Sequence, residues 1–112
     1  SAVWDSGDFE LKRKKIKLNK IVEDVIESIE IQVKNRGGIL TSSFTTSDDI
    51  IEGDKVHITN LVFNLLDNAI KYSKNLPEIH VSTEIKGTNI GLTIEDKGIG
   101  ISKIDQKKIS IT

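Results

Sequence analysis

The sequence predicts a two-layer α/β sandwich in which helices cover one face of a mixed, mostly antiparallel sheet. Two segments carry apolar residues at three- and four-residue steps, which is the pattern of a helix with one buried stripe. Two later segments alternate apolar and polar residues, which is the pattern of strands with one buried face. Because such helices and strands bury their apolar faces against each other, two layers around one core are expected.

The N-terminal part is polar and basic before the first helical pattern begins. Residues 9–12 can form a short edge strand, and the basic cluster at residues 12–15 is interpreted as a solvated strand or loop rather than a binding patch. Residues 18–35 predict a helix with one stripe of valines and isoleucines. Asn19 is placed to cap its start, and the glycines at 37–38 are placed to end it.

The rest of the chain predicts a second helix and a hairpin. Asp54 is the expected N-cap of a helix over residues 55–73. Strands are expected at residues 39–46 and 50–52 before this helix and at 78–86 and 90–94 after it, with a turn at 87–89. The last two strands therefore form a hairpin, and residues 103–108 are expected to be helical.

The composition is that of one modest globular domain, with 37% hydrophobic and 29% charged residues among 112. A net charge of −1 gives no field that favours nucleic acid, so no nucleic-acid partner is expected. No apolar run approaches the ~20 residues of a membrane span, and the lack of cysteine excludes disulfides and thiolate metal sites. The chain contains no methionine, so we interpret residues 1–8 as a tag remnant or linker and 9–112 as the domain.

The second helix combines a mostly buried apolar surface with one narrow polar strip. At about 100° per residue, the strip consists of Asn60, Asn64, Asp67, Asn68 and Lys71. Asparagine is a poor helix former, and a merely solvated strip, which is the alternative, would more often hold Glu, Lys, Gln or Arg. Two carboxamide oxygens one turn apart suit Mg²⁺ when phosphates supply the negative charge, and Lys71 could meet a phosphate. Tyr72 lies beside the strip, where it packs on a flat ligand or forms an ordinary helix boundary.

The segment Asp96-Lys97-Gly98-Ile99-Gly100 carries a second chemical signal. Asp96 shares the parity of the apolar residues of its strand, so in a regular strand its carboxylate points toward the face that the helices cover. A buried carboxylate needs hydrogen-bond donors, and the two glycines allow a close approach of the backbone. This arrangement suits the exocyclic amino group of a purine. The alternative is a turn in which Asp96 caps its own loop.

Together, these motifs resemble those of the ATP-binding, catalytic domain of sensor histidine kinases. This domain belongs to a wider group with type II topoisomerases, Hsp90 chaperones and MutL-type repair proteins. Residues 64–72, Asn-Leu-Leu-Asp-Asn-Ala-Ile-Lys-Tyr, look like the kinase N box, and residues 96–100 look like the first glycine box. The resemblance covers about residues 9–108 and implies a Bergerat-type fold that binds Mg²⁺ and ATP.

The resemblance implies the nucleotide-binding residues Asn64, Asn68, Lys71, Tyr72, Asp96, Gly98, Gly100 and Ile101. Asn68 would be the main Mg²⁺ ligand with Asn64 beside it, and Lys71 would contact phosphate. Tyr72 would stack near adenine, and Asp96 would accept a hydrogen bond from the adenine amino group. The two glycines would let the backbone approach, and the isoleucine after them would line the adenine pocket.

The same resemblance indicates which reaction the parent protein performs. ATP-hydrolysing relatives carry a glutamate at the position of Asn64, and a carboxamide is no useful base near neutral pH. Asn64 therefore favours phosphoryl transfer to a protein histidine. His57 and His80 lack the surroundings of a phospho-acceptor and are interpreted as structural or surface residues. The implied partners are a dimerisation domain that carries the phospho-acceptor and a response regulator. The implied location is the cytoplasmic side, with membrane anchoring of the parent left open.

The sequence also departs from the family pattern after residue 108. The lid over the phosphates and the second glycine box are missing, so the fold is expected to be incomplete at its C-terminus and this chain alone inactive. An open sheet edge would also invite self-association. Two alternatives follow: a nucleotide-incompetent fragment that folds or dimerises, and another ATP-binding relative such as an anti-sigma-factor kinase.

Overall fold

The computed structural model describes residues 14–46, 48–73, 76–97 and 100–107. Its elements are β1 (Lys14–Lys17), α1 (Leu18–Asn35), β2 (Ile39–Ser43), β3 (Ile50–Gly53), α2 (Lys55–Lys71), β4 (Glu78–Lys86), β5 (Asn89–Asp96) and β6 (Gly100–Lys107). The strand expected near residues 9–12 lies outside the described residues. Neither described helix is both long and apolar enough to cross a membrane.

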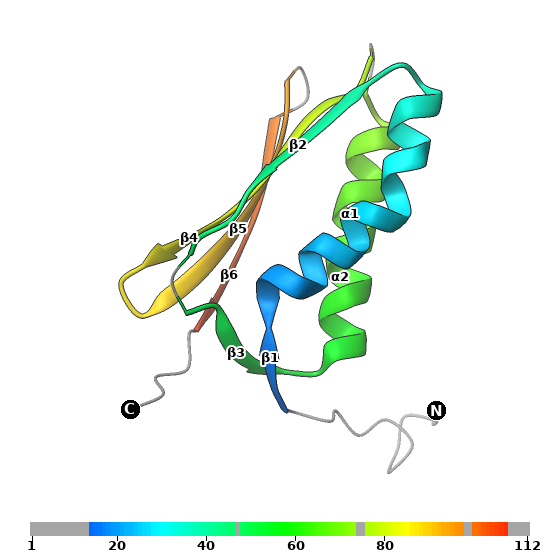
Figure 1. The fold of residues 1–112 in the computed structure, drawn as a ribbon. Coiled ribbons are helices and arrows are strands. Elements are labelled where there is room, and N and C mark those ends of the chain that lie inside the picture. Colours follow the sequence, from blue (N-terminus) through cyan, green and yellow to red (C-terminus); the bar gives the residue numbers. More distant parts are fainter. Residues whose placement is uncertain (1–13, 47, 74–75, 98–99, 108–112) are drawn as a thin grey trace, which may run out of the picture.

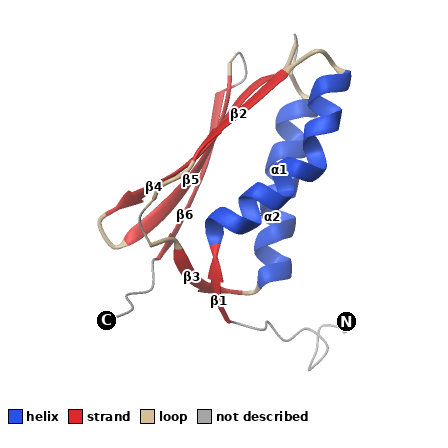
Figure 2. Cartoon of the chain, in the orientation of Figure 1, coloured by secondary structure: helices blue, strands red, loops and turns tan. Residues whose placement is uncertain are grey.

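The fold is the predicted two-layer sandwich. Four strands form a sheet in the order β2-β4-β5-β6, in which β2 and β4 are parallel and the other neighbours antiparallel. Both helices lie on one face of this sheet (Figure 1), and Figure 2 shows the two layers by element type. A separate antiparallel ribbon of β1 and β3 lies at one end. These features confirm the mixed, mostly antiparallel α/β class.

The hydrophobic core lies between the helices and the sheet. Its buried members repeat the stripes and alternation in the sequence, and each contributes roughly 1.5–3 kcal/mol when fully buried. They are Leu18, Ile21, Val22, Val25, Ile29 and Val33 of α1, Ile58, Val62, Leu66 and Ile70 of α2, and Ile51, Ile79, Val81, Ile90, Leu92 and Ile94 of the strands. The core therefore fixes which face each helix and strand turns outward.

Glycines end α1, as predicted. Gly37 has a φ of 74°, and its N–H donates to the Lys34 carbonyl at 2.9 Å. The N–H of Gly38 donates to the Val33 carbonyl, also at 2.9 Å. The two bonds form a Schellman motif, which satisfies carbonyls that the helix end would otherwise leave unpaired.

The prediction that Asn19 caps α1 was wrong. Lys17 holds the N-cap position without a side-chain cap, and Asn19 lies inside the helix. The Asp49 carboxylate accepts the backbone N–H of Asn19 at 2.7 Å, so a distant acidic group serves the positive end of the helix. The Asn19 carboxamide instead donates to the Thr45 carbonyl at 2.9 Å and accepts from the Thr83 hydroxyl at 2.8 Å. Asn19 thus ties α1 to β4.

The predicted helix at residues 103–108 was also wrong, because β6 runs from Gly100 to Lys107. It pairs along β5 from Asp96↔Gly100 to Asn89↔Lys107. A helix would have left this edge of β5 without backbone partners, whereas a strand satisfies both chains.

Other predicted boundaries hold with small shifts. Asp54 is the N-cap of α2, as predicted, and its carboxylate accepts the N–H groups of Val56 and His57 at 2.9 and 3.2 Å. The second helix ends at Lys71 rather than at residue 73. Similarly, β2 ends before residue 46, at Ser43. The hairpin turn is tighter than expected, since β5 already begins at residue 89.

Gly38→Ala is expected to lower the free energy of unfolding by about 2–3 kcal/mol. A Cβ at Gly38 would lie 2.4 Å from the Pro77 carbonyl oxygen, which also accepts the Ile39 N–H at 2.8 Å. Urea denaturation measures the loss. The matched control is Gly53→Ala, whose Cβ would meet its nearest neighbour, on Ile58, at an ordinary 3.6 Å. Equal losses in both variants would contradict this steric explanation.

Candidate functional site

The core packing of α2 turns its polar strip outward. Isoleucines, valine and leucine at every fourth position from Ile58 to Ile70 are buried. This fixes the rotation of the helix, so that Asn60, Asn64 and Asn68 are exposed. The neighbouring apolar residues Leu61, Phe63, Leu65 and Ala69 are only half-buried. The strip is therefore where the sequence placed it, but the buried surface of α2 is narrower than predicted.

The side-chain carboxamide oxygens of the two motif asparagines, Asn64 and Asn68, accept no hydrogen bond from any described residue. Asn64 and Asn68 are one turn apart on one face of α2, with Cβ atoms about 5–6 Å apart by helix geometry. Neither makes a side-chain hydrogen bond within the described part of the chain. Among the described residues, no group of three or more His, Cys, Asp or Glu could hold a metal ion. A divalent cation at this strip would therefore depend on carboxamide oxygens and on oxygens of a ligand.

Lys71 supplies a positive charge at the end of the strip. Its Nζ lies 2.9 Å from Oδ2 of Asp67, and its side chain is 64% exposed. The hydrogen bond and the charge of Asp67 raise the pKa of Lys71, so it is protonated at neutral pH. The ammonium group can therefore turn toward an anionic ligand without a change of protonation.

Asp96 is buried at the end of β5, on the face that the helices cover. It is 4% exposed and shares this face with Leu92 and Ile94, as its parity predicted. Both carboxylate oxygens are buried and have no hydrogen-bond partner among the described residues. Burial, and secondarily the charge of Glu78, raises the pKa of Asp96. A buried acceptor without a donor is unfavourable, and an incoming N–H donor would relieve it.

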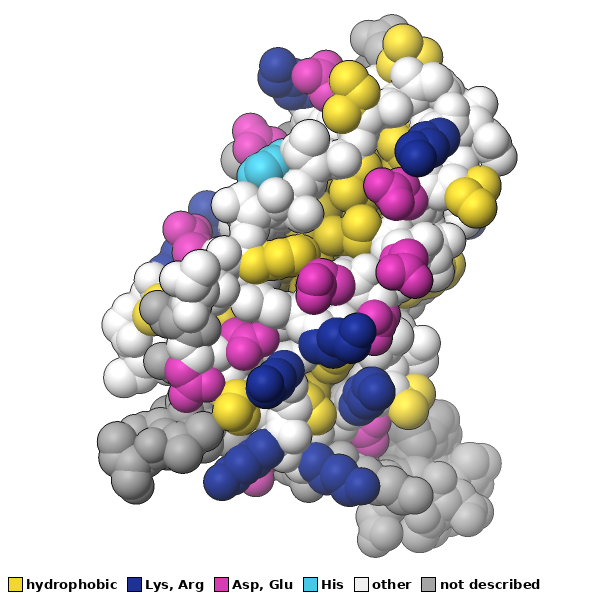
Figure 3. All heavy atoms as spheres, viewed as in Figure 1, with side chains coloured by type: hydrophobic (Ala, Val, Ile, Leu, Met, Phe, Trp, Pro, Cys, Tyr) yellow, Lys and Arg dark blue, Asp and Glu magenta, His cyan; other side chains and the backbone are white. Residues whose placement is uncertain are grey.

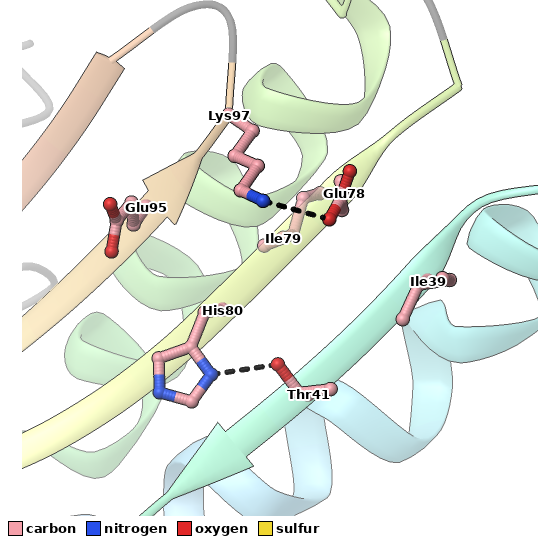
Figure 4. Close-up of a pocket in the computed structure, with 7 residues that line it drawn as sticks. All are labelled: Ile39, Thr41, Glu78, Ile79, His80, Glu95 and Lys97. Atoms are coloured by element: carbon pink, nitrogen blue, oxygen red, sulfur yellow. Dashed lines mark hydrogen bonds and ion pairs between the residues drawn. The ribbon is translucent and has the colours of Figure 1, made fainter.

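The fold brings Asp96 and the last turns of α2 to the same end of the molecule. Asp96 pairs with Ile79 in the second position of β4, shortly after the chain leaves α2. Figure 1 shows the end of α2, the end of β5 and the start of β6 at this end of the sandwich. The Lys97 N–H donates to the Glu78 carbonyl at 3.2 Å, and its Nζ lies 3.4 Å from Oε2 of Glu78 (Figure 4). These two contacts fix the residue that follows Asp96.

The other predicted site residues are placed less completely. Tyr72 is the C-cap of α2 and is 69% exposed. Gly100 begins β6 opposite Asp96, and Ile101 pairs with Glu95. Gly98 and the side chain of Ile101 lie outside the described residues. The roles given to these residues therefore stay predictions.

A shallow cavity of about 230 Å³ opens mainly on the face of the sheet that the helices do not cover (Figure 4). Its lining residues are Ile39, Thr41, Glu78, Ile79, His80, Glu95 and Lys97. His80 Nδ1 and the Thr41 hydroxyl are hydrogen-bonded at 2.7 Å, and His57 is exposed at the start of α2. The interpretation of both histidines as structural or surface residues rather than phospho-acceptors stays a prediction. This cavity contains none of the predicted site residues.

Basic side chains gather at the end of the molecule that carries β1 (Figure 3). The described members are the exposed lysines Lys14, Lys15, Lys17, Lys20 and Lys55. Lys20 forms an ion pair with Asp24 at 3.2 Å. Of the basic cluster predicted at residues 12–15, Lys14 and Lys15 are exposed on β1, which agrees with a solvated strand, and residues 12 and 13 lie outside the described residues.

Sequence reasoning missed Arg36. Its guanidinium donates to the carbonyls of Ile70 and Ser73, at the end of α2. No local pattern could have shown this contact, because the partners are 34 and 37 residues away.

The chain without a bound ligand is expected to lose stability as the pH rises from the ordinary pKa of an aspartate through the raised pKa of Asp96. In this window the folded chain binds the proton more tightly than the unfolded chain, so rising pH favours unfolding. Urea denaturation across this pH range measures the stability of the wild-type chain and of Asp96→Asn. Because the variant keeps every other carboxylate, the difference between the two isolates the contribution of Asp96. The difference in stability between variant and wild type should grow as the pH rises. A constant difference would contradict the burial of an Asp96 carboxylate that has no partner within the described part of the chain.

The chain is similar to known proteins over most of its length. The family model "Histidine kinase-, DNA gyrase B-, and HSP90-like ATPase" matches residues 53–110. Sensor protein RprX of Bacteroides fragilis is 35% identical, in an alignment covering 96% of this chain and 21% of that protein. Sensor-like histidine kinase SenX3 of Mycolicibacterium smegmatis is 29% identical, covering 84% of this chain and 24% of that protein. This chain thus spans between a fifth and a quarter of these two relatives.

Solved structures show the same fold. Histidine kinase AdeS of Acinetobacter baumannii aligns with a TM-score of 0.69 at 26% identity, covering 84% of this chain and 46% of that one. The histidine kinase ThkA, solved in complex with the response regulator protein TrrA, aligns with a TM-score of 0.70 at 20% identity. That alignment covers 77% of this chain and 26% of the solved chain.

Proposed function

The chain belongs to the histidine kinase-, DNA gyrase B- and HSP90-like ATPase family, and on this premise we propose that it is the ATP-binding domain of a sensor histidine kinase. Its parent protein would bind Mg²⁺ and ATP and transfer the γ-phosphoryl group to a histidine on a separate dimerisation domain. A response regulator would then be the next partner. The domain would act on the cytoplasmic side of the membrane.

The observation that carries this proposal is the carboxylate of Asp96, which has no hydrogen-bond partner among the described residues. It is buried at the same end of the sandwich as the exposed carboxamides of Asn64 and Asn68. A single ligand with an N–H donor at one end and anionic oxygens that share a divalent cation with the carboxamide oxygens at the other would suit both groups, and ATP with Mg²⁺ has this chemistry.

At the base, Asp96 would accept a hydrogen bond from the adenine amino group. Guanine presents a carbonyl oxygen at the corresponding position, which would repel the carboxylate, so the site would select adenine. Gly98 and Gly100 would let the backbone approach the base. Tyr72 would stack near adenine and Ile101 would line the pocket.

At the phosphates, Asn68 would be the main protein ligand of Mg²⁺, with Asn64 beside it on the metal or on its water. Lys71 would contact a phosphate oxygen. When bound, Mg²⁺ and ATP supply the reactive phosphoryl group and neutralise part of its charge. The chain's own residues bind and orient this group. Since the Asn64 carboxamide takes no proton from water, the site favours transfer to a histidine over hydrolysis.

Transfer from radiolabelled ATP tests this function directly. The intact parent protein, which carries its own dimerisation domain, would be incubated with the labelled ATP, and the label on that domain would be followed with time. We expect acid-labile label on a histidine and little release of inorganic phosphate. Steady phosphate release without labelled protein would instead indicate an ATP-hydrolysing relative.

A further inference from the structure

Arg36 connects the two helices at the end that carries the candidate site. It is the C-cap residue of α1, and its guanidinium reaches the last turn of α2. Nη1 donates to the Ile70 carbonyl, and Nη2 donates to the Ser73 carbonyl at 3.3 Å. A cation at this position complements the negative end of the α2 dipole, and its hydrogen bonds satisfy carbonyls at the helix end.

The backbone of Arg36 is itself fixed. Its N–H donates to the carbonyls of Gln32 and Val33 at 3.3 and 3.2 Å. The Schellman motif at Gly37 and Gly38 follows directly. The guanidinium therefore extends from a rigid helix end, so it can define where the last turn of α2 lies.

That last turn carries residues of the proposed phosphate and metal site. Ile70 directly precedes Lys71 and Tyr72, and Ser73 directly follows them. Asn68 belongs to the same turn, since its carbonyl accepts the Tyr72 N–H at 3.0 Å. Arg36 thus holds the carbonyls on both sides of Lys71 and Tyr72.

The same junction continues to Asp96. Gly38 packs against Pro77, and the Ile39 N–H donates to the Pro77 carbonyl at 2.8 Å. The next residue, Glu78, accepts the N–H of Lys97. A short series of contacts therefore links the end of α2 to the strand end that holds Asp96.

From this geometry we propose that Arg36 is a positioning residue for the nucleotide. It fixes the last turn of α2, with Asn68 and Lys71, relative to Asp96, so that one ligand spans both. The inference rests on the proposed function but adds a residue that lies outside both motifs. Arg36 acts through the α2 carbonyls, so its loss should weaken the contacts of Asn68 and Lys71 at the phosphate and metal end of the ligand. The adenine end should lose less, because its main contact, Asp96, lies on β5 and only Tyr72 comes from the turn that Arg36 holds.

The test compares the affinities of four chains for Mg-ATP and for adenosine, by NMR titration. The chains are wild type, Arg36→Ala, Arg36→Lys and Lys34→Ala. Lys34 is exposed in the last turn of α1, so its removal deletes a nearby charge without the two hydrogen bonds. Thermal melting followed by circular dichroism sets a temperature at which every variant is folded.

We expect Arg36→Ala to raise the Kd for Mg-ATP by roughly 5- to 10-fold and the Kd for adenosine by less than about 2-fold. Arg36→Lys keeps a cationic donor and should restore most of the affinity, and Lys34→Ala should stay within about 2-fold of wild type. An unchanged Mg-ATP affinity in Arg36→Ala would overturn the inference, as would an equal loss for both ligands or an equal loss in Lys34→Ala. A folded wild-type chain that binds neither ligand would overturn the proposed function itself.

Discussion

Asp96→Asn is expected to weaken ATP binding by about 10- to 100-fold, which is the loss expected for one hydrogen bond to a charged acceptor. The same change should raise the free energy of unfolding of the nucleotide-free chain by about 1 kcal/mol at neutral pH, because it removes a buried charge that has no partner among the described residues. Binding and stability thus move in opposite directions. This is the signature of a residue kept for its ligand, since a structural aspartate would lose stability on substitution.

Calorimetric titration with ATP and GTP, combined with urea denaturation, measures both effects. Glu95→Gln is the matched control, because Glu95 is the exposed neighbour on the opposite face of the same strand. This control should leave ATP affinity within about 2-fold and stability within about 0.5 kcal/mol of wild type. If Asp96→Asn bound ATP like wild type, Asp96 would not be the adenine acceptor.

Asn68→Ala is expected to remove most Mg²⁺-dependent affinity for ATP and to abolish autophosphorylation of an intact parent kinase. The carboxamide is exposed and makes no hydrogen bond within the described residues. Its loss should therefore change the free energy of unfolding by no more than about 0.5 kcal/mol. Radiolabel from ATP, measured with and without Mg²⁺, reports the loss.

Asn60→Ala provides the control for Asn68→Ala. Asn60 is exposed on the same polar strip, two turns earlier in α2, and lies outside the N box. The Asn60→Ala variant should therefore be labelled by radioactive ATP to the same extent as wild type. Unchanged labelling in Asn68→Ala, or an equal loss in Asn60→Ala, would contradict the assignment of the metal to the end of the strip.

The elements that could be predicted from the sequence are those whose signal is local. The alternation in β4 and β5, the apolar stripes of the helices and the Asp54 cap each depend on residues a few positions apart. The inward direction of Asp96 is equally local, because it follows from parity along one strand. This is why the position of the candidate acceptor could be predicted before the packing was known.

The features that the sequence did not reveal depend on distant partners. Asp49 serves the start of α1 from 30 residues away, which leaves Asn19 free to bind other groups. The last strand, β6, forms because its backbone pairs with the edge of β5 along its whole length. Arg36 finds its acceptors at the end of the other helix. In each case the local pattern was compatible with another structure, and tertiary contacts decided between them.

The most direct test of the central claim is a calorimetric titration of the 112-residue chain with ATP, with and without Mg²⁺. The proposed site predicts binding of one ATP per chain, with micromolar affinity that falls when Mg²⁺ is chelated. A folded chain that gives no binding heat and no change in melting temperature with either form of ATP would contradict it, and would favour a nucleotide-incompetent module.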